Sequence, residues 1–431
     1  MQTRFTAEQL ADPGIADCER NLRNCVHCGF CLATCPTYTL LGDELDSPRG
    51  RIYLIKDMLE NDRPASAEVA LHVDRCLSCL ACQTTCPSGV HYQHLIDHAR
   101  AHVENTYRRP FLDRALRAVL ASLLPYPGRF RFALMLAGLA RPLRGLFAGR
   151  LGAMLALAPS HPPPQDRTFA GEVFPATGPR RGRVALLTGC AQKVIAPSIN
   201  AATIRLLNRH GVEVVVPRAA GCCGAIVHHM GKEGQARHLA LDTIRAWTDE
   251  ADAHGLDAIV VNTSGCGTEI KDYGHIFRDD PVWAEPAARV SALARDISEY
   301  MAEIGLKPPI ETTGLTIAYH AACSLQHGQK VTGQPKALLA AAGFAVRDVP
   351  EGHLCCGSAG TYNLLQPEIA DRLKARKLAN IARTQAEVIA TGNVGCITQL
   401  AGGAGIPVLH TVELLDWATG GPKPEALQGK L

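Results

Sequence analysis

The chain has 431 residues, too many for one ordinary hydrophobic core, so several domains are expected. Apolar residues make up 47% and charged residues 20%, a balance that excludes a disordered chain. The net charge is only +3 and aromatic residues make up 5%, so neither electrostatics nor base stacking points to nucleic acid as a partner.

The first fourteen residues contain no apolar signal segment, and no run of eighteen uncharged apolar residues follows anywhere. We therefore expect a cytoplasmic protein, with contact at the cytoplasmic face of the inner membrane as an alternative. Disulfides do not persist in a reducing compartment. The seventeen cysteines are therefore interpreted as metal ligands.

Two runs near the N-terminus share the spacing C-x2-C-x2-C-x3-C-P. They are Cys25, Cys28, Cys31 and Cys35 before Pro36, and Cys76, Cys79, Cys82 and Cys86 before Pro87. The short gaps wrap three thiolates around one face of a cubic cluster, and the fourth cysteine reaches the other cluster. The runs predict one [4Fe–4S] cluster on Cys25, Cys28, Cys31 and Cys86, and a second on Cys76, Cys79, Cys82 and Cys35. Four-cysteine zinc sites are the alternative, although they rarely show two such runs.

Between the runs, Ser47 and Pro48 predict the start of a helix, because serine caps and proline suits the first helical position. The wide separation of the runs leaves room for further helices, so residues 1–110 (the head) are predicted to form an α-helical ferredoxin domain. Arg49 and Arg51 either offset the negative charge of the clusters or are solvated. Cys18 is interpreted as a plain thiol, and His27 as a packing or hydrogen-bonding residue.

Residues 111–182 contain no cysteine and are rich in leucine, alanine and arginine. The arginines interrupt every apolar run, which predicts short amphipathic helices. These helices form a bridge packed on the chain itself, or else a docking surface for a partner subunit or an anionic membrane. The stretch from Pro162 to Gly182 is predicted to be an extended, proline-rich linker.

The remaining eight cysteines form two matching sets. The sets are Cys190, Cys222, Cys223 and Cys266, and Cys323, Cys355, Cys356 and Cys396. Cys323 follows Cys190 by 133 residues, and Cys355 follows Cys222 by the same 133. Such a repeat indicates an internal duplication. We call residues 183–310 the first copy and residues 311–431 the second copy.

Each copy is predicted to alternate strands and helices, with a cysteine after each strand. The strands are Arg183–Leu187, Val212–Val216 and Ala258–Asn262, and then Leu315–Tyr319, Phe344–Val349 and Glu387–Thr391. This order indicates parallel α/β layers, whose strand ends converge where such sheets bind ligands. Gly211 and Gly343 fit helix ends before the second strands. The predicted fold class is therefore α+β and multidomain, a helical ferredoxin domain followed by two repeated α/β Cys-Cys-Gly domains.

The metal content of the copies is left open. Two adjacent cysteines diverge and do not suit one small ion, whereas a larger iron–sulfur assembly takes both, and Gly224 and Gly357 allow close backbone approach. One or two further iron–sulfur clusters, zinc, or a catalytic dithiol are the alternatives. Several nearby histidines are interpreted as supporting residues that could replace a thiolate: His228, His229, His320, His327 and His353.

No phosphate-binding loop, dinucleotide fingerprint, zinc-protease or nucleophile-elbow motif is present in the sequence. We therefore predict no catalytic residue on this chain and expect the substrate chemistry to take place on other subunits.

Several segments resemble the iron–sulfur subunits of bacterial glycolate oxidases. They are Cys25–Cys31, Leu41–Ile52, Ser264–Gly267, His353–Gly360 and both Cys-Cys-Gly sets. The resemblance implies a complex with FAD-containing subunits that oxidise glycolate to glyoxylate, from which electrons pass to a quinone or another membrane acceptor. Subunits of lactate and glycerol-3-phosphate dehydrogenases share this layout and are the alternative.

Heterodisulfide reductase subunits also share the layout, which leaves a catalytic subunit of that type as a further alternative. In those relatives each Cys-Cys-Gly domain ends in C-x2-C and holds a non-cubane cluster on five thiolates. Here Cys266 is followed by Gly-Thr-Glu and Cys396 by Ile-Thr-Gln. The fifth cysteine is missing, so four-thiolate sites are expected.

Overall fold

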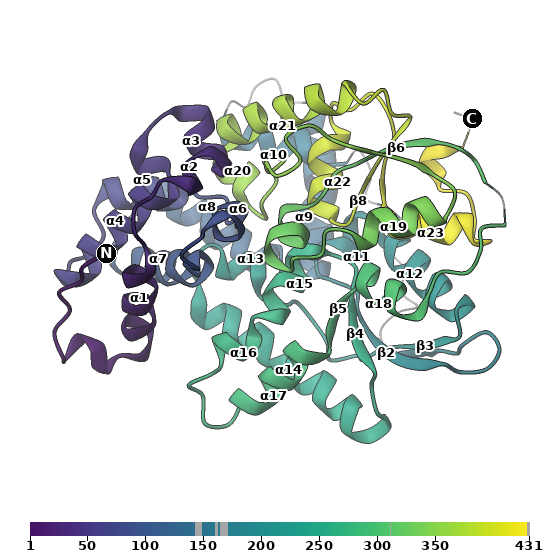
Figure 1. Cartoon of the computed structure of the whole chain (residues 1–431), viewed down its shortest axis with the longest axis horizontal. Helices are drawn as coiled ribbons and strands as arrows, with labels where there is room; N and C mark the ends of the chain where they lie inside the picture. The colour runs from purple at the N-terminus through teal and green to yellow at the C-terminus, as the bar shows by residue number, and fades with distance from the viewer. Residues whose placement is uncertain (143–148, 160–162, 164–170, 311, 429–431) are drawn as a thin grey trace.

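The computed structural model describes residues 1–142, 149–159, 163, 171–310 and 312–428. Figure 1 shows the purple helical head beside two sheet-containing copies, coloured teal to yellow. Helices without strands are followed by two mainly parallel α/β units, so the predicted fold class is confirmed.

The head contains only helices. They are α1 (Pro13–Asn24), α2 (Phe30–Thr34), α3 (Pro36–Leu41), α4 (Pro48–Glu60), α5 (Ala67–Asp74), α6 (Ala81–Thr85) and α7 (Tyr92–Thr106), with the short turns η1 (Gln9–Ala11) and η2 (Glu44–Asp46). The helix predicted after Ser47 is α4, whose Gly50 N–H donates to Ser47 Oγ at 3.0 Å. Leu22, Ile55 and Leu95 are fully buried between these helices.

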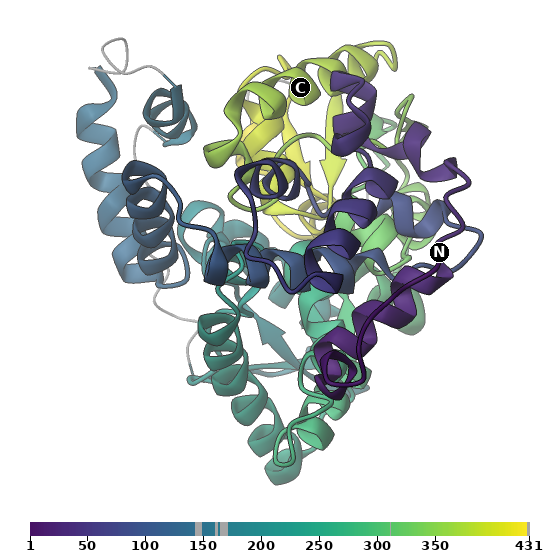
Figure 2. The same ribbon diagram turned by 90° about the vertical axis from the view of Figure 1, so that its left-hand side faces the viewer.

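The middle region forms the predicted short helices, here called the helical layer: α8 (Phe111–Leu123), α9 (Pro127–Ala140) and α10 (Gly149–Leu157). Figure 2 shows this layer in blue at the left of the molecule. Residues 162 and 164–170 of the predicted proline-rich linker lie outside the described residues. The described residues 171–182 are not an extended linker throughout, because they include strand β1 (Glu172–Phe174), which pairs with the otherwise open edge of β3 (Val212–Val216).

The first copy is built on β2 (Gly182–Leu187), β3 (Val212–Val216) and β4 (Ala258–Val261), as predicted, with β5 (Ala294–Asp296) added. The strand order is β1-β3-β2-β4-β5, and only β1 is antiparallel. The helices are α11 (Gln192–Ile195), α12 (Pro197–Arg209), α13 (Ala225–His228), α14 (Glu233–His254), α15 (Ser264–Lys271), α16 (Tyr273–Ile276), α17 (Ala284–Leu293) and α18 (Ile297–Ile304).

The second copy repeats this plan with β6 (Thr316–Tyr319), β7 (Ala345–Asp348), β8 (Val388–Thr391) and β9 (Val408–His410) in the parallel order β7-β6-β8-β9. Its helices are η4 (Ser324–Gly328, a π-helical turn), α19 (Gln334–Ala341), α20 (Tyr362–Leu365), α21 (Pro367–Ala382), α22 (Val394–Ala401), α23 (Thr411–Ala418) and η5 (Glu425–Leu427). Gly211 and Gly343 precede β3 and β7 with φ of 84° and 86°, the left-handed conformation expected at a helix end.

The two copies share one apolar core. Buried side chains of both sheets form a single cluster, and α12 packs on α23 while α18 packs on α19. Asp416 in α23 is almost fully buried and pairs with two arginines of α12, at 2.6 Å from Arg205 and 2.8 Å from Arg209. The copies are therefore held together by both apolar and ionic contacts.

His410, at the end of β9, is expected to make the fold sensitive to acid. Its Nδ1 accepts a hydrogen bond from Val412 N–H at 3.1 Å, and the side chain is fully buried. Burial lowers the pKa of His410 to about 4, whereas in the unfolded chain it is about 6.5. The unfolded state therefore binds the proton first, and stability falls as the pH drops from 6.5 toward 4.

His410→Asn keeps a capping acceptor that does not titrate. Between pH 7 and pH 5 the parent chain is expected to lose about 2 kcal/mol more unfolding free energy than this variant. Anaerobic urea denaturation at the two pH values measures the difference. Equal losses in both proteins would exclude this role of His410.

Candidate iron–sulfur sites

The two cysteine loops of the head adopt the same backbone conformation. His27 and Gly29 in the first loop have φ of 55° and 85°, and Ser78 and Leu80 at the matching positions of the second have 48° and 60°. Left-handed residues turn the chain tightly, which brings the sulfurs of one run to one side. The helices that follow, α2 and α6, pack against each other.

Two small cavities are lined by the eight cysteines of the two runs. The first is lined by Cys25, Cys28, Cys31 and Cys86, the second by Cys35, Cys76 and Cys79, and Cys82 lines both. The second run contributes Cys82 and Cys86 to the first cavity, and the first run contributes Cys35 to the second, because α2 and α6 pack against each other. Sulfur donors surround each cavity and no carboxylate lines either one, a donor set that fits a [4Fe–4S] cluster.

Several sulfurs of the head are buried and receive hydrogen bonds. Burial raises the pKa of the Cys79 and Cys82 thiols, so iron must displace protons to bind there. Around Cys76 Sγ, the Ser78 N–H donates at 3.4 Å and the Tyr92 hydroxyl at 3.9 Å. Hydrogen bonds to sulfur of this kind tune the reduction potential of a cluster.

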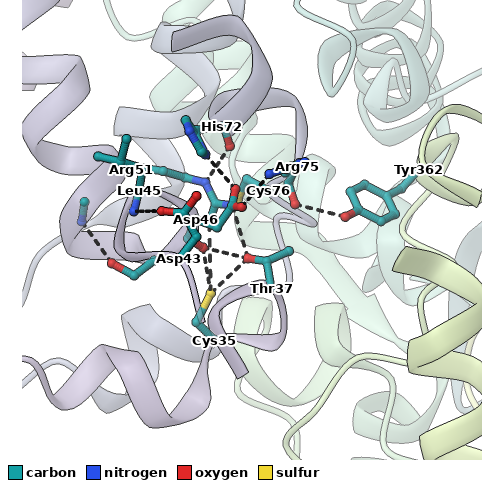
Figure 3. A network of polar contacts seen from close by, with 12 residues as sticks. Cys35, Thr37, Asp43, Leu45, Asp46, Arg51, His72, Arg75, Cys76 and Tyr362 are labelled. Atoms are coloured by element: carbon teal, nitrogen blue, oxygen red, sulfur yellow. Dashed lines mark hydrogen bonds and ion pairs between the residues drawn. The ribbon is translucent and has the colours of Figure 1, made fainter. Parts of the chain in front are cut away.

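A buried ionic network lies against the second cavity (Figure 3). Asp46 is fully buried and is held by His72 at 2.9 Å, Arg75 at 2.7 Å and Arg51 at 3.3 Å. Arg51 is itself 1% exposed and reaches Cys35 Sγ at 3.9 Å, so the solvated role considered for it is wrong. Arg49 lies nearer the surface and pairs with Glu44 at 2.6 Å.

Cys18 and His27, which were not predicted to be ligands, lie in different places in the head. Cys18 is buried in the head core outside both cavities, and burial raises its pKa. His27 lies on the wall of the first cavity, with its ring edge-on to Tyr53.

In both copies the cysteines follow the carboxyl ends of three neighbouring strands. Cys190, the pair Cys222–Cys223 and Cys266 follow β2, β3 and β4, whereas Cys323, the pair Cys355–Cys356 and Cys396 follow β6, β7 and β8. The chain crosses to opposite sides of β2 and of β6, so each set lies at a topological switch point.

The two sets share their local geometry. Cys222 Sγ lies 3.4 Å from Cys190 Sγ, and Cys323 Sγ lies 3.7 Å from Cys355 Sγ. In each Cys-Cys-Gly the glycine N–H donates to the sulfur two residues before it at 3.4 Å. Gly224 and Gly357 have φ of 90° and 91°, and a Cβ there would lie 2.8 Å and 2.5 Å from a carbonyl oxygen of α14 and of α21, respectively. Only glycine permits this turn.

The second set has one further donor. His320, Cys356 and Cys396 present their donor atoms within 4.8 Å of one another. His320 is 1% exposed, burial lowers its pKa to about 3, and neither ring nitrogen has a hydrogen-bond partner among the described residues. The corresponding position in the first copy, 133 residues earlier, is Leu187. The two copies therefore offer different donor sets.

The other histidines serve different contacts. His228 pairs with Glu269 at 2.8 Å, and His327 bonds to Thr84 of the head at 2.8 Å. His229 lies on the wall of a larger cavity between the copies. His353 lies two residues before Cys355, and its carbonyl oxygen is 3.2 Å from His327 Nε2.

A central cavity of about 530 Å³ lies between the two copies and the helical layer. Seven of the eight cysteines of the copies line it: Cys190, Cys223, Cys266, Cys323, Cys355, Cys356 and Cys396. The opposite wall comes from α8, α9 and α10, whose part in this site the sequence did not predict. No cysteine or motif in residues 111–157 marks those helices as part of a site.

The sulfur sites form a continuous series through the molecule. Cys82 lines both cavities of the head, and Cys79 of the second cavity packs in one buried cluster with Cys355 of the second copy. Leu77, the neighbour of Cys76, lines the central cavity. The series begins at the surface, where Cys28 is exposed, and ends at the central cavity in the interior of the molecule.

Comparisons with known proteins agree with this arrangement. A family described as "4Fe-4S dicluster domain" matches residues 21–90, and one described as "Cysteine-rich domain" matches residues 184–271 and 317–401. The chain is 40% identical over 419 residues to the glycolate oxidase iron-sulfur subunit of Escherichia coli K12, covering 97% of this chain and 99% of that protein. The chain belongs to the family of glycolate oxidase iron–sulfur subunits.

A further member of the glycolate oxidase iron–sulfur subunit family, from Bacillus subtilis, carries the name "Probable glycolate oxidase iron-sulfur subunit" and is 32% identical over 399 residues, 89% of each chain. Lactate utilization protein A of Oceanobacillus iheyensis is 26% identical over 241 residues, 54% of this chain and 96% of that protein. A crystal structure of a hypothetical protein from Helicobacter pylori has a TM-score of 0.54 at 11% identity, covering 96% of this chain and 74% of that one, and shares the fold. The predicted resemblance, the electron-transfer role and the iron–sulfur cofactors are confirmed.

Proposed function

We propose that this chain is the iron–sulfur subunit of a complex that oxidises glycolate to glyoxylate. FAD-containing partner subunits carry out the oxidation, and this chain passes the electrons to a quinone or another membrane acceptor. The continuous series of sulfur-lined sites is the main support for electron transfer through this chain. The 40% identity over 97% of the chain to a glycolate oxidase subunit supports glycolate as the substrate of the complex.

The two head cavities and the strand ends support the ligand sets proposed here. One [4Fe–4S] cluster is assigned to Cys25, Cys28, Cys31 and Cys86, and the second to Cys35, Cys76, Cys79 and Cys82; the copies bind iron–sulfur clusters or zinc through their own four cysteines. The lining of the cavities supports this division. We propose residues 1–110, 111–182, 183–310 and 311–431 as the units that carry these parts.

Electrons enter at the first cluster. Cys28 is exposed, and the apolar side chains of Val26 and Phe30 beside it are 67% and 63% exposed. Exposed apolar side chains around a redox site suit a protein partner. This is the face proposed for the FAD-containing subunit.

The helical layer is proposed to contact the membrane at its cytoplasmic face. Phe132, Leu136 and Leu139 on α9 are 59%, 52% and 78% exposed, and Arg129 and Arg131 flank them. Apolar side chains together with arginines suit an anionic lipid surface. No helix in the described part of the chain has the length and apolar content to cross a bilayer.

A lactate-oxidising complex is the second candidate. The likeness to lactate utilization protein A favours it, although it covers only 54% of this chain.

Purification with the FAD-containing partners tests the proposed function. The complex is expected to reduce a water-soluble dye with glycolate as donor, whereas this chain alone is expected to show no turnover, because no substrate site is predicted on it. Glycolate turnover by the isolated chain would contradict a relay role. Faster dye reduction with lactate than with glycolate would favour the second candidate.

Metal analysis of the chain purified without oxygen tests the cofactors. We expect about eight iron and eight sulfide per chain from the head, since each [4Fe–4S] cluster holds four of each. An iron content well above eight atoms per chain would show that the copies also bind iron–sulfur clusters. An iron content near eight with stoichiometric zinc would show that the copies bind zinc. Iron well below eight with visible absorption absent would overturn the assignment for the head.

A further inference from the structure

One wall of the central cavity, formed by α8, α9 and α10, contains no cysteine. Clusters bound to its cysteines would occupy the side formed by the strand ends. The opposite side is built from aliphatic and aromatic side chains of the helical layer, among them Leu120, Phe130, Leu134 and Met154. Such side chains offer no ligand to a cluster, but they are the usual lining of a pocket for an organic molecule. The volume of about 530 Å³ is that of the whole cavity, which the clusters and an organic ligand would share.

His229, at the end of α13 in the first copy, is one of the polar residues that line the cavity, and 31% of its side chain is accessible. Its Nδ1 is buried 3.9 Å from Asp97 Oδ1 on α7 and has no hydrogen-bond partner among the described residues, which leaves Nε2 as the nitrogen available to a ligand in the cavity. Arg100 on the same helix and His228 beside it are the other charged or titratable groups that act on it.

A cavity with one apolar wall beside redox sites, and with His229 among its polar side chains, fits an apolar ring that carries a carbonyl oxygen. We propose that the cavity between α9, α10 and the two cysteine sets binds the electron acceptor, a quinone, with His229 as the donor to one ring carbonyl. This inference rests on the proposed electron-transfer function and adds the place where the electrons leave the chain. The exposed apolar side chains of α9 lie on the same helical layer, which gives a membrane-dissolved quinone a short route to the cavity.

The reaction balances with the proposed function. Reduction of a quinone consumes two electrons, which the proposed electron-transfer function would supply, and two protons from solvent, and both carbonyl groups become hydroxyl groups. His229 passes one proton to the carbonyl oxygen that it holds and regains a proton from solvent. The hydroquinone then leaves toward the membrane.

A pair of variants in the helical layer tests the site. Leu134 on α9 is 9% exposed and lines the cavity, whereas Val119 on α8 is 47% exposed and does not line it. In the complex with the FAD-containing partners, Leu134→Trp is expected to raise the KM for a decyl-substituted benzoquinone by about tenfold or more. Val119→Trp is expected to leave it unchanged. Iron content and visible absorption show whether each variant has folded and kept its clusters.

A photoreactive azidoquinone provides a second measurement that needs no variant. Irradiation of the parent complex is expected to label peptides of α9 or α10, and excess decyl-substituted benzoquinone is expected to prevent it. Labelling only on a partner subunit, or an unchanged KM in a folded Leu134→Trp complex, would overturn the quinone site. Dye reduction by the parent complex with glycolate would still stand in that case, so failure of the site is distinguishable from failure of the proposed function.

Discussion

Cys86→Ser is expected to alter or abolish the cluster on Cys25, Cys28 and Cys31, and to spare the cluster beside its own sequence neighbours Cys76 and Cys79. The reason is geometric, because Cys86 lines the first cavity of the head and not the second. Electron paramagnetic resonance of the reduced protein should show one of the two head signals changed. If the cluster is lost, the iron content should fall by about four per chain.

Cys18→Ser is the control for this experiment. Cys18 is also a buried thiol of the head, but it lines neither cavity. It should leave both signals and the iron content unchanged. Loss of the Cys76–Cys79 signal in Cys86→Ser would refute the crossed assignment.

Arg51→Ala is expected to destabilise the head by about 3–5 kcal/mol, because it leaves the buried carboxylate of Asp46 without one of its partners. Arg51 also donates to the carbonyl oxygen of His72 at 2.6 Å and lies 3.9 Å from Cys35 Sγ. The second head cluster should therefore change its resonance signal as well. Anaerobic urea denaturation measures the loss in free energy of unfolding.

Arg49→Ala provides the matched comparison, since Arg49 lies two residues earlier on the same helix and pairs with the half-exposed Glu44. A surface pair of this kind contributes about 0–1 kcal/mol, so little loss is expected. Equal effects of the two substitutions would show that the Asp46 network does not stabilise the head.

Spacing alone predicted which cysteines lie near one another in the structure. Two-residue gaps restrict a loop so strongly that Cys25–Cys31 and Cys76–Cys82 have few ways to arrange their sulfurs. The repeat at 133 residues predicted six strands, and each appears within about two residues of its expected bounds, the usual uncertainty at element ends. These features depend on residues that are close together in the sequence, which is why cysteine spacing and short apolar runs predict them.

Features that depend on distant contacts could not be predicted. β1, β5 and β9 are three residues each, too short to show alternation, and they exist because a neighbouring strand offers an open edge. Asp46 gains its partners only when η2, α4 and α5 pack together. The central cavity requires the helical layer to face both copies, which no motif in residues 111–157 encodes.

The packing between the copies has the pattern of a two-fold axis. The helix after the first core strand of one copy, α12, packs on the last long helix of the other, α23, and the equivalent helices α19 and α18 pack in the reciprocal way. A surface that contacts its own counterpart is what a symmetric homodimer uses. A single repeat would therefore be complementary to itself, and an ancestral unit could have worked as a dimer before gene fusion. After fusion each half could diverge, and His320 in the second copy stands at the position that Leu187 occupies in the first.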